Sequence, residues 1–257
     1  MTSLNAHDLP AATRALLDNI QAAEARGHDP LVVFDLDETL YSNDHRTLRI
    51  LQEYAHTHAA RLGGFYELMG RLSPGDVHYG VATTLRAAGV QDDGLIADVQ
   101  AFWAERFFTN AYVQVDLARS GAVELVNLVY EAGGVPCYLT GRDAPAMLVG
   151  TVAALQRDGF PVGTVDTRTI LKPDPSTSDA EYKAAVIEHL HKTGDVVGAF
   201  DNEPGLCNLF KRAFPNAAVV WVDSSHAPGA PSLDPEITAV RHFTELLPPR
   251  ASHRGEA

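Results

Sequence analysis

Two aspartates follow a short apolar run near the N-terminus, in the stretch LVVFDLDETLY at residues 31–41. Asp35 comes directly after four apolar residues, Asp37 follows two positions later, and Thr39 two positions after that. A single carboxylate at this point could simply begin a turn. Two unpaired carboxylates at the end of a buried strand are costly, however, unless they serve a function or bind a cation. The spacing therefore indicates a functional site.

Two later apolar runs also end in polar groups. The run VPCYL ends at Thr140, and the run VVGAF is followed by Asp201, Asn202 and Glu203. Taken alone, each would be a turn that precedes a helix. In an open parallel sheet, however, ligands bind beyond the carboxyl ends of the strands, so neighbouring strands would bring these oxygens into one crevice. Clustered carboxylates need a cation, and oxygen ligands favour Mg²⁺, which usually also binds a substrate phosphate.

The elements that must position these residues alternate between strand and helix. The apolar runs predict strands at residues 31–34, 135–139, 164–171, 196–200 and 217–222. Amphipathic patterns predict helices at residues 10–26, 119–132, 143–158, 179–191, 204–213 and 235–246. Such alternation indicates the α/β class, with a doubly wound parallel sheet covered by crossover helices on both faces.

The connection between the first two strands is far longer than the dozen or so residues that a crossover requires. It contains helical patterns at residues 46–61, 64–71, 76–88 and 92–107, and one strand-like run, AYVQV, at residues 111–115. We therefore expect an α/β core formed by residues 1–43 and 117–250. An inserted helical domain at residues 44–116 would lie over the carboxyl edge of the sheet, and residues 251–257 would form a frayed tail.

Composition excludes some classes of partner. The chain has 257 residues, of which 46% are hydrophobic and 21% charged, with a formal net charge of −13. Such an acidic balance argues against general nucleic-acid binding and against binding to a membrane surface. Cys137 and Cys207 stand beside apolar residues, which predicts buried free thiols in a reducing compartment. No signal-like start and no apolar run of about 18 residues is present, so we expect a cytoplasmic protein.

The stretch FDLDETL resembles the first motif, Asp-x-Asp-x-Thr, of the haloacid dehalogenase-like (HAD) hydrolase superfamily, most of whose members are Mg²⁺-dependent phosphatases. Thr140 in YLTGRD is similar to the second motif, and Asp201 in AFDNEP to the fourth. The resemblance covers residues 30–40 and 119–223, while the inserted helices resemble a cap domain only in placement. The fourth motif commonly carries two aspartates, whereas Asn202 and Glu203 follow here, which leaves the role of these two residues open.

The third motif of the superfamily is a lysine, and two lysines match its position. Lys172 lies at a predicted strand end in LKPDP, and Lys183 lies in the first turns of the helix DAEYKAAVIEHL. We favour Lys183, because the lysine of the superfamily typically lies at the start of the helix before the fourth motif. Lys172 remains the alternative.

The resemblance implies a mechanism as well as a fold. Asp35 would attack phosphorus and form an aspartyl-phosphate, and Asp37 would act first as general acid and then as general base. We expect a turn directly after Asp35 that brings Asp37 into the same site. The implied ligands are Asp35, Asp37 (through its backbone carbonyl) and Asp201 for Mg²⁺, and Thr140, Gly141 and Lys183 for the phosphate.

The resulting prediction is a Mg²⁺-dependent phosphatase that acts on a small phosphorylated molecule. A phosphotransferase of the same fold and a non-catalytic ligand-binding or partner-binding module are the alternatives, whereas Asp37 argues against a dehalogenase, which needs no general acid. We expect Arg142 to be exposed on a loop and three aromatic side chains to pack in a helix face, namely Trp103, Phe107 and Phe108. Nothing in the sequence predicts the substrate or the oligomeric state.

Overall fold

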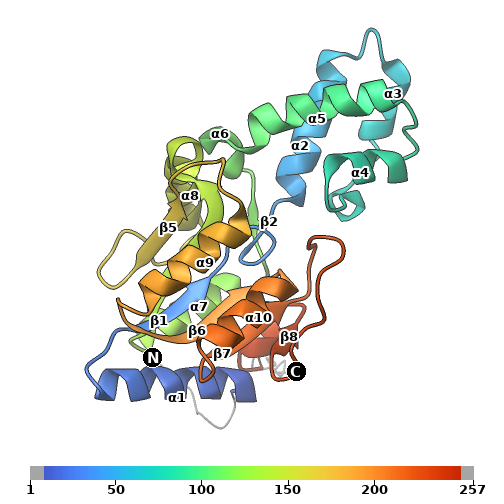
Figure 1. Cartoon of the computed structure of the whole chain (residues 1–257). Helices are drawn as coiled ribbons and strands as arrows, with labels where there is room; N and C mark the ends of the chain where they lie inside the picture. The colour runs from blue at the N-terminus through green and yellow to red at the C-terminus, as the bar shows by residue number, and fades with distance from the viewer. Residues whose placement is uncertain (1–8, 250–257) are drawn as a thin grey trace, which may run out of the picture.

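The core of the protein is a parallel sheet of six strands (Figure 1). The computed structural model describes residues 9–249, so the predicted tail at residues 251–257 lies outside the described residues. The strands are β1 (Pro30–Phe34), β4 (Val135–Asp143), β5 (Arg168–Lys172), β6 (Asp195–Asp201), β7 (Ala218–Val222) and β8 (Thr238–Val240). Their order is β5-β4-β1-β6-β7-β8, with every neighbouring pair parallel. The chain therefore adds strands first on one side of β1 and then on the other, which places the switch point of the sheet at β1.

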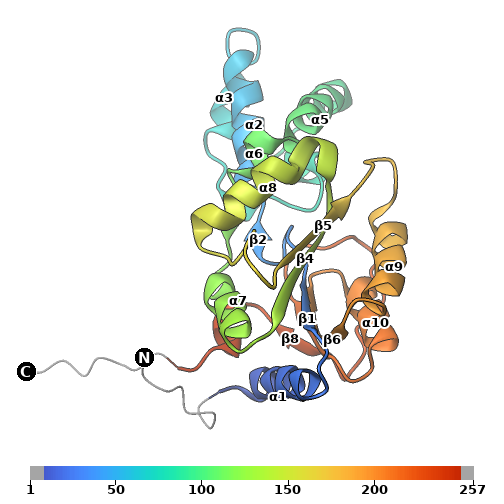
Figure 2. The ribbon, with the colours of Figure 1, turned by 90° about the vertical axis from the view of Figure 1, so that its left-hand side faces the viewer.

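Helices cover both faces of this sheet, as the alternating pattern predicts (Figure 2). Apolar side chains of α1 (Ala11–Ala25), α7 (Ala122–Glu131) and α8 (Ala144–Asp158) form a cluster with one face. Those of α9 (Asp179–Leu190) and α10 (Pro204–Ala213) form a second cluster with the other face. The predicted α/β doubly wound fold is confirmed. Both cysteines are free and buried in the second cluster. Across residues 9–249, no helix is long and apolar enough to cross a membrane.

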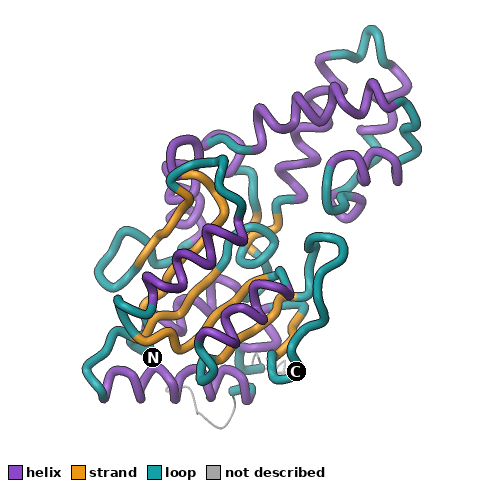
Figure 3. Tube along the Cα trace, in the orientation of Figure 1, coloured by secondary structure: helices purple, strands orange, loops and turns teal. Residues whose placement is uncertain are grey.

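An insertion of helices lies between two short strands that pair with each other. β2 (Tyr41–Ser42) and β3 (Leu117–Ala118) form an antiparallel ribbon through which the chain leaves the core and returns to it. Between them lie α2 (Asp44–Thr57), α3 (Gly63–Met69), the 3₁₀ turn η2 (Pro74–Asp76), α4 (Val81–Ala87), α5 (Asp93–Phe107) and α6 (Asn110–Val113). These helices have a hydrophobic cluster of their own and project to one side of the core (Figure 3).

Two sequence predictions of secondary structure are wrong. The run AYVQV lies in α6 and in the turn after it, where a strand was predicted. The start of α6 packs tightly against α8, since a Cβ at Gly150 would lie 2.3 Å from the Asn110 carbonyl oxygen. The segment 235–246 forms strand β8 and a 3₁₀ turn, η3 (Phe243–Leu246), where a helix was predicted. β8 pairs with the edge of β7, and this tertiary pairing outweighs a weak helical pattern.

Candidate active site

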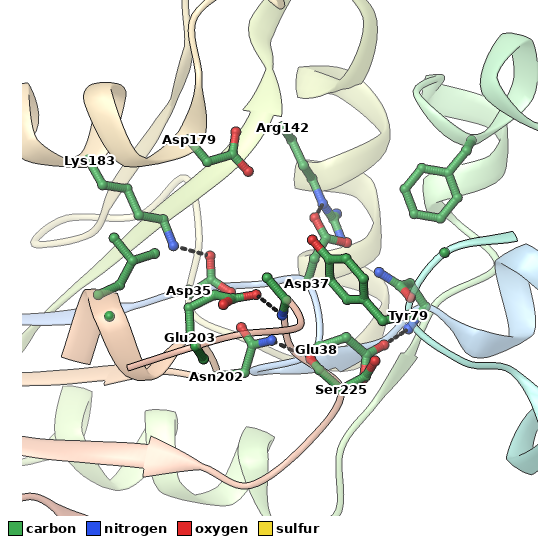
Figure 4. A pocket seen from close by; sticks show the side chains of 18 of the residues that line it. Asp35, Asp37, Glu38, Tyr79, Arg142, Asp179, Lys183, Asn202, Glu203 and Ser225 are labelled. Carbon is green, nitrogen blue, oxygen red and sulfur yellow. Dashed lines mark hydrogen bonds and ion pairs between the residues drawn. The ribbon is translucent and has the colours of Figure 1, made fainter. Parts of the chain in front are cut away.

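A crevice of about 1070 Å³ lies between the carboxyl ends of the central strands and the inserted helices. Asp35, Asp37, Gly141 and Lys183 line it, and Figure 4 shows three of them facing the same space. Thr140 and Asp201 are buried, with Thr140 accepting a hydrogen bond from the backbone N–H of Arg142. The predicted site residues therefore meet at one edge of the sheet, because β4 and β6 flank β1.

A tight turn follows Asp35, as we expected. The backbone N–H groups of Thr39 and Tyr41 both donate to the carbonyl of Leu36, at 3.2 and 2.9 Å. Within this turn Glu38 has a φ of 60°, a left-handed conformation that is unfavourable for a residue with a side chain. The Glu38 carboxylate is held by Arg119 and by the backbone N–H of Asn43. The motif loop is thus tied to both strands of the ribbon that carries the insertion.

Lys183 joins two carboxylates from neighbouring strands. Its Nζ donates to Oδ1 of Asp35 and to Oδ2 of Asp201, each at 2.7 Å, and all three side chains are buried. The hydroxyl of Thr39 donates to the second oxygen of Asp35 at 2.9 Å. Lys172 lies elsewhere, with its Nζ 2.7 Å from the carboxylate of Asp179. Of the two candidate lysines, only Lys183 contacts the aspartates of the motifs.

Burial and neighbouring opposite charges act in opposite directions on the pKa values of Asp35 and Lys183. Burial raises the pKa of Asp35 to about 7, with the charge of Lys183 lowering it and that of Asp201 raising it. Burial also disfavours the charged form of Lys183, but the negative charges of Asp201 and Asp35 outweigh it and raise the pKa of that lysine. Burial is thus the main cause of the raised pKa of Asp35, and Lys183 offsets it only in part.

Asp37 is held by two arginines that also share a second aspartate. Arg142 binds it in a bidentate manner, with Nε and Nη2 each 2.9 Å from a carboxylate oxygen, and Nη2 of Arg46 lies 2.6 Å from Oδ1. Both arginines also donate to Asp116, each at 2.8 Å. We call these four residues the buried charge cluster. The prediction that Arg142 is exposed is wrong: it is 2% exposed, because two carboxylates compensate its charge.

The buried charge cluster favours the ionised form of Asp37. Burial opposes ionisation, but the charges of Arg142 and then Arg46 outweigh it and hold the pKa of Asp37 well below its usual range. Burial raises the pKa of Asp116 to about 6 in spite of the same two arginines. The Asp37 side chain remains 30% exposed, on the side of the crevice. Sequence reasoning missed Arg46 and Asp116.

Solved structures share this architecture. The chain matches a Clostridium difficile protein assigned as a phosphatase at a TM-score of 0.52 and 13% identity, over 86% of this chain and 92% of that one. A Bacteroides fragilis protein assigned as a haloacid dehalogenase-like hydrolase matches at a TM-score of 0.50 and 12% identity, over 85% of this chain and all of that one. The chain has the HAD-like fold.

Other comparisons are more distant. A class C acid phosphatase from Bacillus anthracis with tungstate bound matches at a TM-score of 0.40 and 16% identity, and the match spans 65% of its length and 79% of this chain. No protein-family model and no curated protein matches the sequence. The comparisons therefore establish the fold of this chain and nothing finer.

The oxygens at this edge of the HAD-like sheet suit Mg²⁺. Within residues 9–249 no group of three or more histidine, cysteine, aspartate or glutamate side chains is placed to hold a metal ion. Mg²⁺ does not require one, because it is usually bound through one or two carboxylates, with water and substrate phosphate completing its shell. Asp35 and Asp201 supply two such carboxylates beside a single lysine. The donor set is all oxygen and carries excess negative charge, so it fits the ion.

The residues after Asp201 have structural contacts. Asn202 Oδ1 lies 3.2 Å from the hydroxyl of Thr39, and its Nδ2 donates to the carbonyl of Ser225. Glu203 accepts a hydrogen bond from the backbone N–H of Ala227 at 2.9 Å. Asn202 therefore lies between the motif loop and the loop after β7, and Glu203 holds the loop after β7, contacts that their sequence position alone does not indicate.

The aromatic side chains of α5 do more than pack in a helix face. Phe107 is buried, and Trp103 stacks on it at 4.3 Å between ring centroids. Phe108 contacts both rings but is 48% exposed. All three line the crevice. The prediction of core packing is wrong for Phe108, because α5 ends at Phe107 and the next side chain turns out of the helix pattern.

Proposed function

We propose that the protein is a Mg²⁺-dependent phosphatase that hydrolyses a small phosphate monoester through an aspartyl-phosphate on Asp35. The observation that carries this proposal is that Asp35, at the end of the central strand, lines a large crevice together with Asp37 and Lys183. A carboxylate so placed can attack a bound phosphate, and the cation beside it offsets the charge of the phosphoryl oxygens.

In the first step one carboxylate oxygen of Asp35 attacks phosphorus while the bond to the leaving oxygen breaks. The hydrogen bonds from Lys183 and Thr39 fix the orientation of Asp35 before attack. Gly141, which lines the crevice, and Thr140 beside it would bind the phosphate. Asp35, Asp201 and the backbone carbonyl of Asp37 would hold Mg²⁺, which when bound reduces repulsion between the two anions.

In the second step water attacks the aspartyl-phosphate, and Asp37 takes the proton of that water. Its ionised state suits this half of the reaction. The acid half, donation of a proton to the leaving oxygen, requires that Asp37 first gain a proton, which Arg46 and Arg142 oppose. Arg46 belongs to the insertion, which we propose acts as a cap at residues 44–116 on a core formed by residues 1–43 and 117–250. Movement of this cap would remove Arg46 from Asp37.

The first test is hydrolysis of p-nitrophenyl phosphate, with the released p-nitrophenol and inorganic phosphate both measured. We expect turnover that requires Mg²⁺, stops in EDTA, and falls at least about 10³-fold in D35N and D37N. Asp179→Asn is the matched control, because Asp179 lines the same crevice outside the motifs. Equal loss in all three variants, or no turnover at any enzyme concentration, would refute the proposal. Less phosphate than phenol would indicate transfer to another acceptor.

A second prediction concerns pH and Mg²⁺ together. The pKa of Asp35 rises to about 7 on folding, from about 4 in an unfolded chain. Because the folded-state pKa is the higher one, stability in EDTA should fall as the pH rises through this interval. Mg²⁺ needs the ionised carboxylate, so it should raise the thermal midpoint more at about pH 8 than at about pH 5.5. An equal Mg²⁺ effect at both pH values, or the same pH dependence in D35N, would contradict the assignment.

A further inference from the structure

The wall of the crevice that faces the motif residues is aromatic. Phe108 rests on Trp103 and Phe107 with ring centroids 5.7 and 5.0 Å away, which leaves 48% of its side chain exposed. Tyr79, in the loop between η2 and α4, is 53% exposed. Its ring projects into the crevice, with the hydroxyl toward the side where Asp37 and Arg142 lie (Figure 4). Large aromatic surfaces left exposed beside a candidate nucleophile indicate a ligand that covers them.

The same wall has no lysine or arginine. Among the described residues of the insertion that line the crevice, the titratable side chains are Asp44, His78 and Tyr79. The core contributes Arg142, Lys172 and Lys183, each paired with carboxylates, and Arg212 in the last turn of α10. Arg212 is exposed and also lines the crevice. The wall formed by the insertion therefore offers a ligand aromatic contacts and no lysine or arginine.

The size and the remaining lining of the crevice also favour a bulky apolar group. At about 1070 Å³, the crevice is as large as those that hold drug-sized ligands. Opposite the aromatic wall lie Leu206 and Leu209 of α10 and Pro228 and Pro231 of the loop after β7. A small polyol would leave most of these apolar surfaces in contact with water, whereas an aromatic ring would cover them.

We propose that the alcohol part of the phosphate ester is an aromatic group, and that Tyr79 and Phe108 bind its ring. This inference rests on the proposed phosphatase function, since it places the phosphate at Asp35. The negative charges of Glu203 and Asp179, which after burial raise the pKa of Tyr79, indicate that its hydroxyl faces the core. Tyr79 and Phe108 would thus set substrate specificity from the insertion, while the core residues carry the chemistry.

The test is binding of non-hydrolysable phosphonates in the presence of Mg²⁺, measured by calorimetry. Benzylphosphonate should bind at least about 10-fold more tightly than ethylphosphonate, because only the first carries a ring. Y79A and F108A should each reduce this preference by about 3- to 10-fold, the worth of an aromatic pair. Tyr66→Ala is the matched control, since Tyr66 is an exposed aromatic residue of the insertion, 45% exposed, outside the crevice lining.

Two results would overturn the inference. They are equal affinity for the two phosphonates, and equal losses for both ligands in Y79A and F108A. Turnover gives the separate readout for the function itself. Benzyl phosphate should have a higher kcat/KM than ethyl phosphate or ribose 5-phosphate, and both benzyl and ethyl esters have alkanol leaving groups. If no ester is hydrolysed but the binding preference persists, the phosphatase proposal fails while the aromatic specificity stands.

Discussion

A Lys183→Met protein is expected to hydrolyse p-nitrophenyl phosphate about 10³-fold more slowly than the wild-type protein, whereas Lys172→Met is expected to lose less than about 10-fold. Sequence position favours Lys183 and leaves Lys172 as the alternative, and the contacts of the two lysines distinguish them. Lys183 donates to Asp35 and Asp201, while Lys172 pairs with Asp179. Methionine preserves most of the volume of the side chain but removes its charge.

Two effects of the Lys183 substitution act in the same direction. The charge that offsets the phosphoryl oxygens is lost, and the pKa of Asp35, already raised by burial to about 7, rises further without its cation. Less of the nucleophile is then ionised at neutral pH. The activity that remains in K183M should therefore increase as the pH is raised from about 7 to about 9, a dependence that Lys172→Met should not share.

The measurement is kcat/KM against pH for the wild-type protein and both variants, with thermal midpoints to confirm that each is folded. A larger loss in Lys172→Met than in K183M would assign the motif lysine to Lys172 and contradict the geometry of the trio. Equal small losses in both would contradict a role for either lysine in neutralising the phosphate.

The residues at the strand ends could be predicted because a simple topological rule governs them. Asp35, Thr140 and Asp201 each stand at or directly after a short apolar run, and a parallel sheet brings the carboxyl ends of its strands to one edge. Lys183 could be favoured because α9 leads directly into β6. In each case a few consecutive residues hold the whole signal.

The buried charge cluster follows no such local rule. Arg46 and Asp116 are 70 residues apart, as their hydrogen bond spans the whole insertion. Each has the polar character of an exposed residue when considered with its neighbours alone. The available signal is indirect: an insertion leaves and re-enters the core at adjacent points, here the β2–β3 ribbon, so charged residues at its two ends lie near each other. The sequence indicates that proximity but not the pairing with Arg142.

The aromatic wall was missed for a related reason. The predicted helix ends at residue 107, as α5 does, but Phe108 was assigned to its packed face, and a residue one position beyond a helix end no longer follows the helical pattern. The C-terminal segment shows the same limitation, because three residues of β8 are too few to produce a strand pattern. In both segments, tertiary context decided the structure.

An Asp116→Asn protein is expected to lose about 3–5 kcal/mol of unfolding free energy, the largest stability effect that we predict for one substitution. Asp116 is 0% exposed and pairs with both Arg46 and Arg142. Its removal leaves two buried guanidinium groups with Asp37 as their remaining carboxylate. Asparagine keeps the shape and one acceptor, so the loss reports on charge and not on a cavity.

Urea unfolding of D116N, R46M and the double variant would separate the charge effect from packing. R46M alone should also be destabilising, because it removes the contact of Arg46 with the Phe107 ring, 3.8 Å from its centroid. In the double variant only one guanidinium remains, with Asp37 beside it, so the combined loss should be smaller than the sum of the single losses.

Asp93→Asn is the control. Its ion pair with Arg86 is similar in length, at 2.9 Å, but exposed, so its loss should lower the unfolding free energy by less than about 1 kcal/mol. If D116N loses no more unfolding free energy than Asp93→Asn, the buried charge cluster does not hold the insertion to the core. Arg46 would then not couple the position of the insertion to the protonation of Asp37.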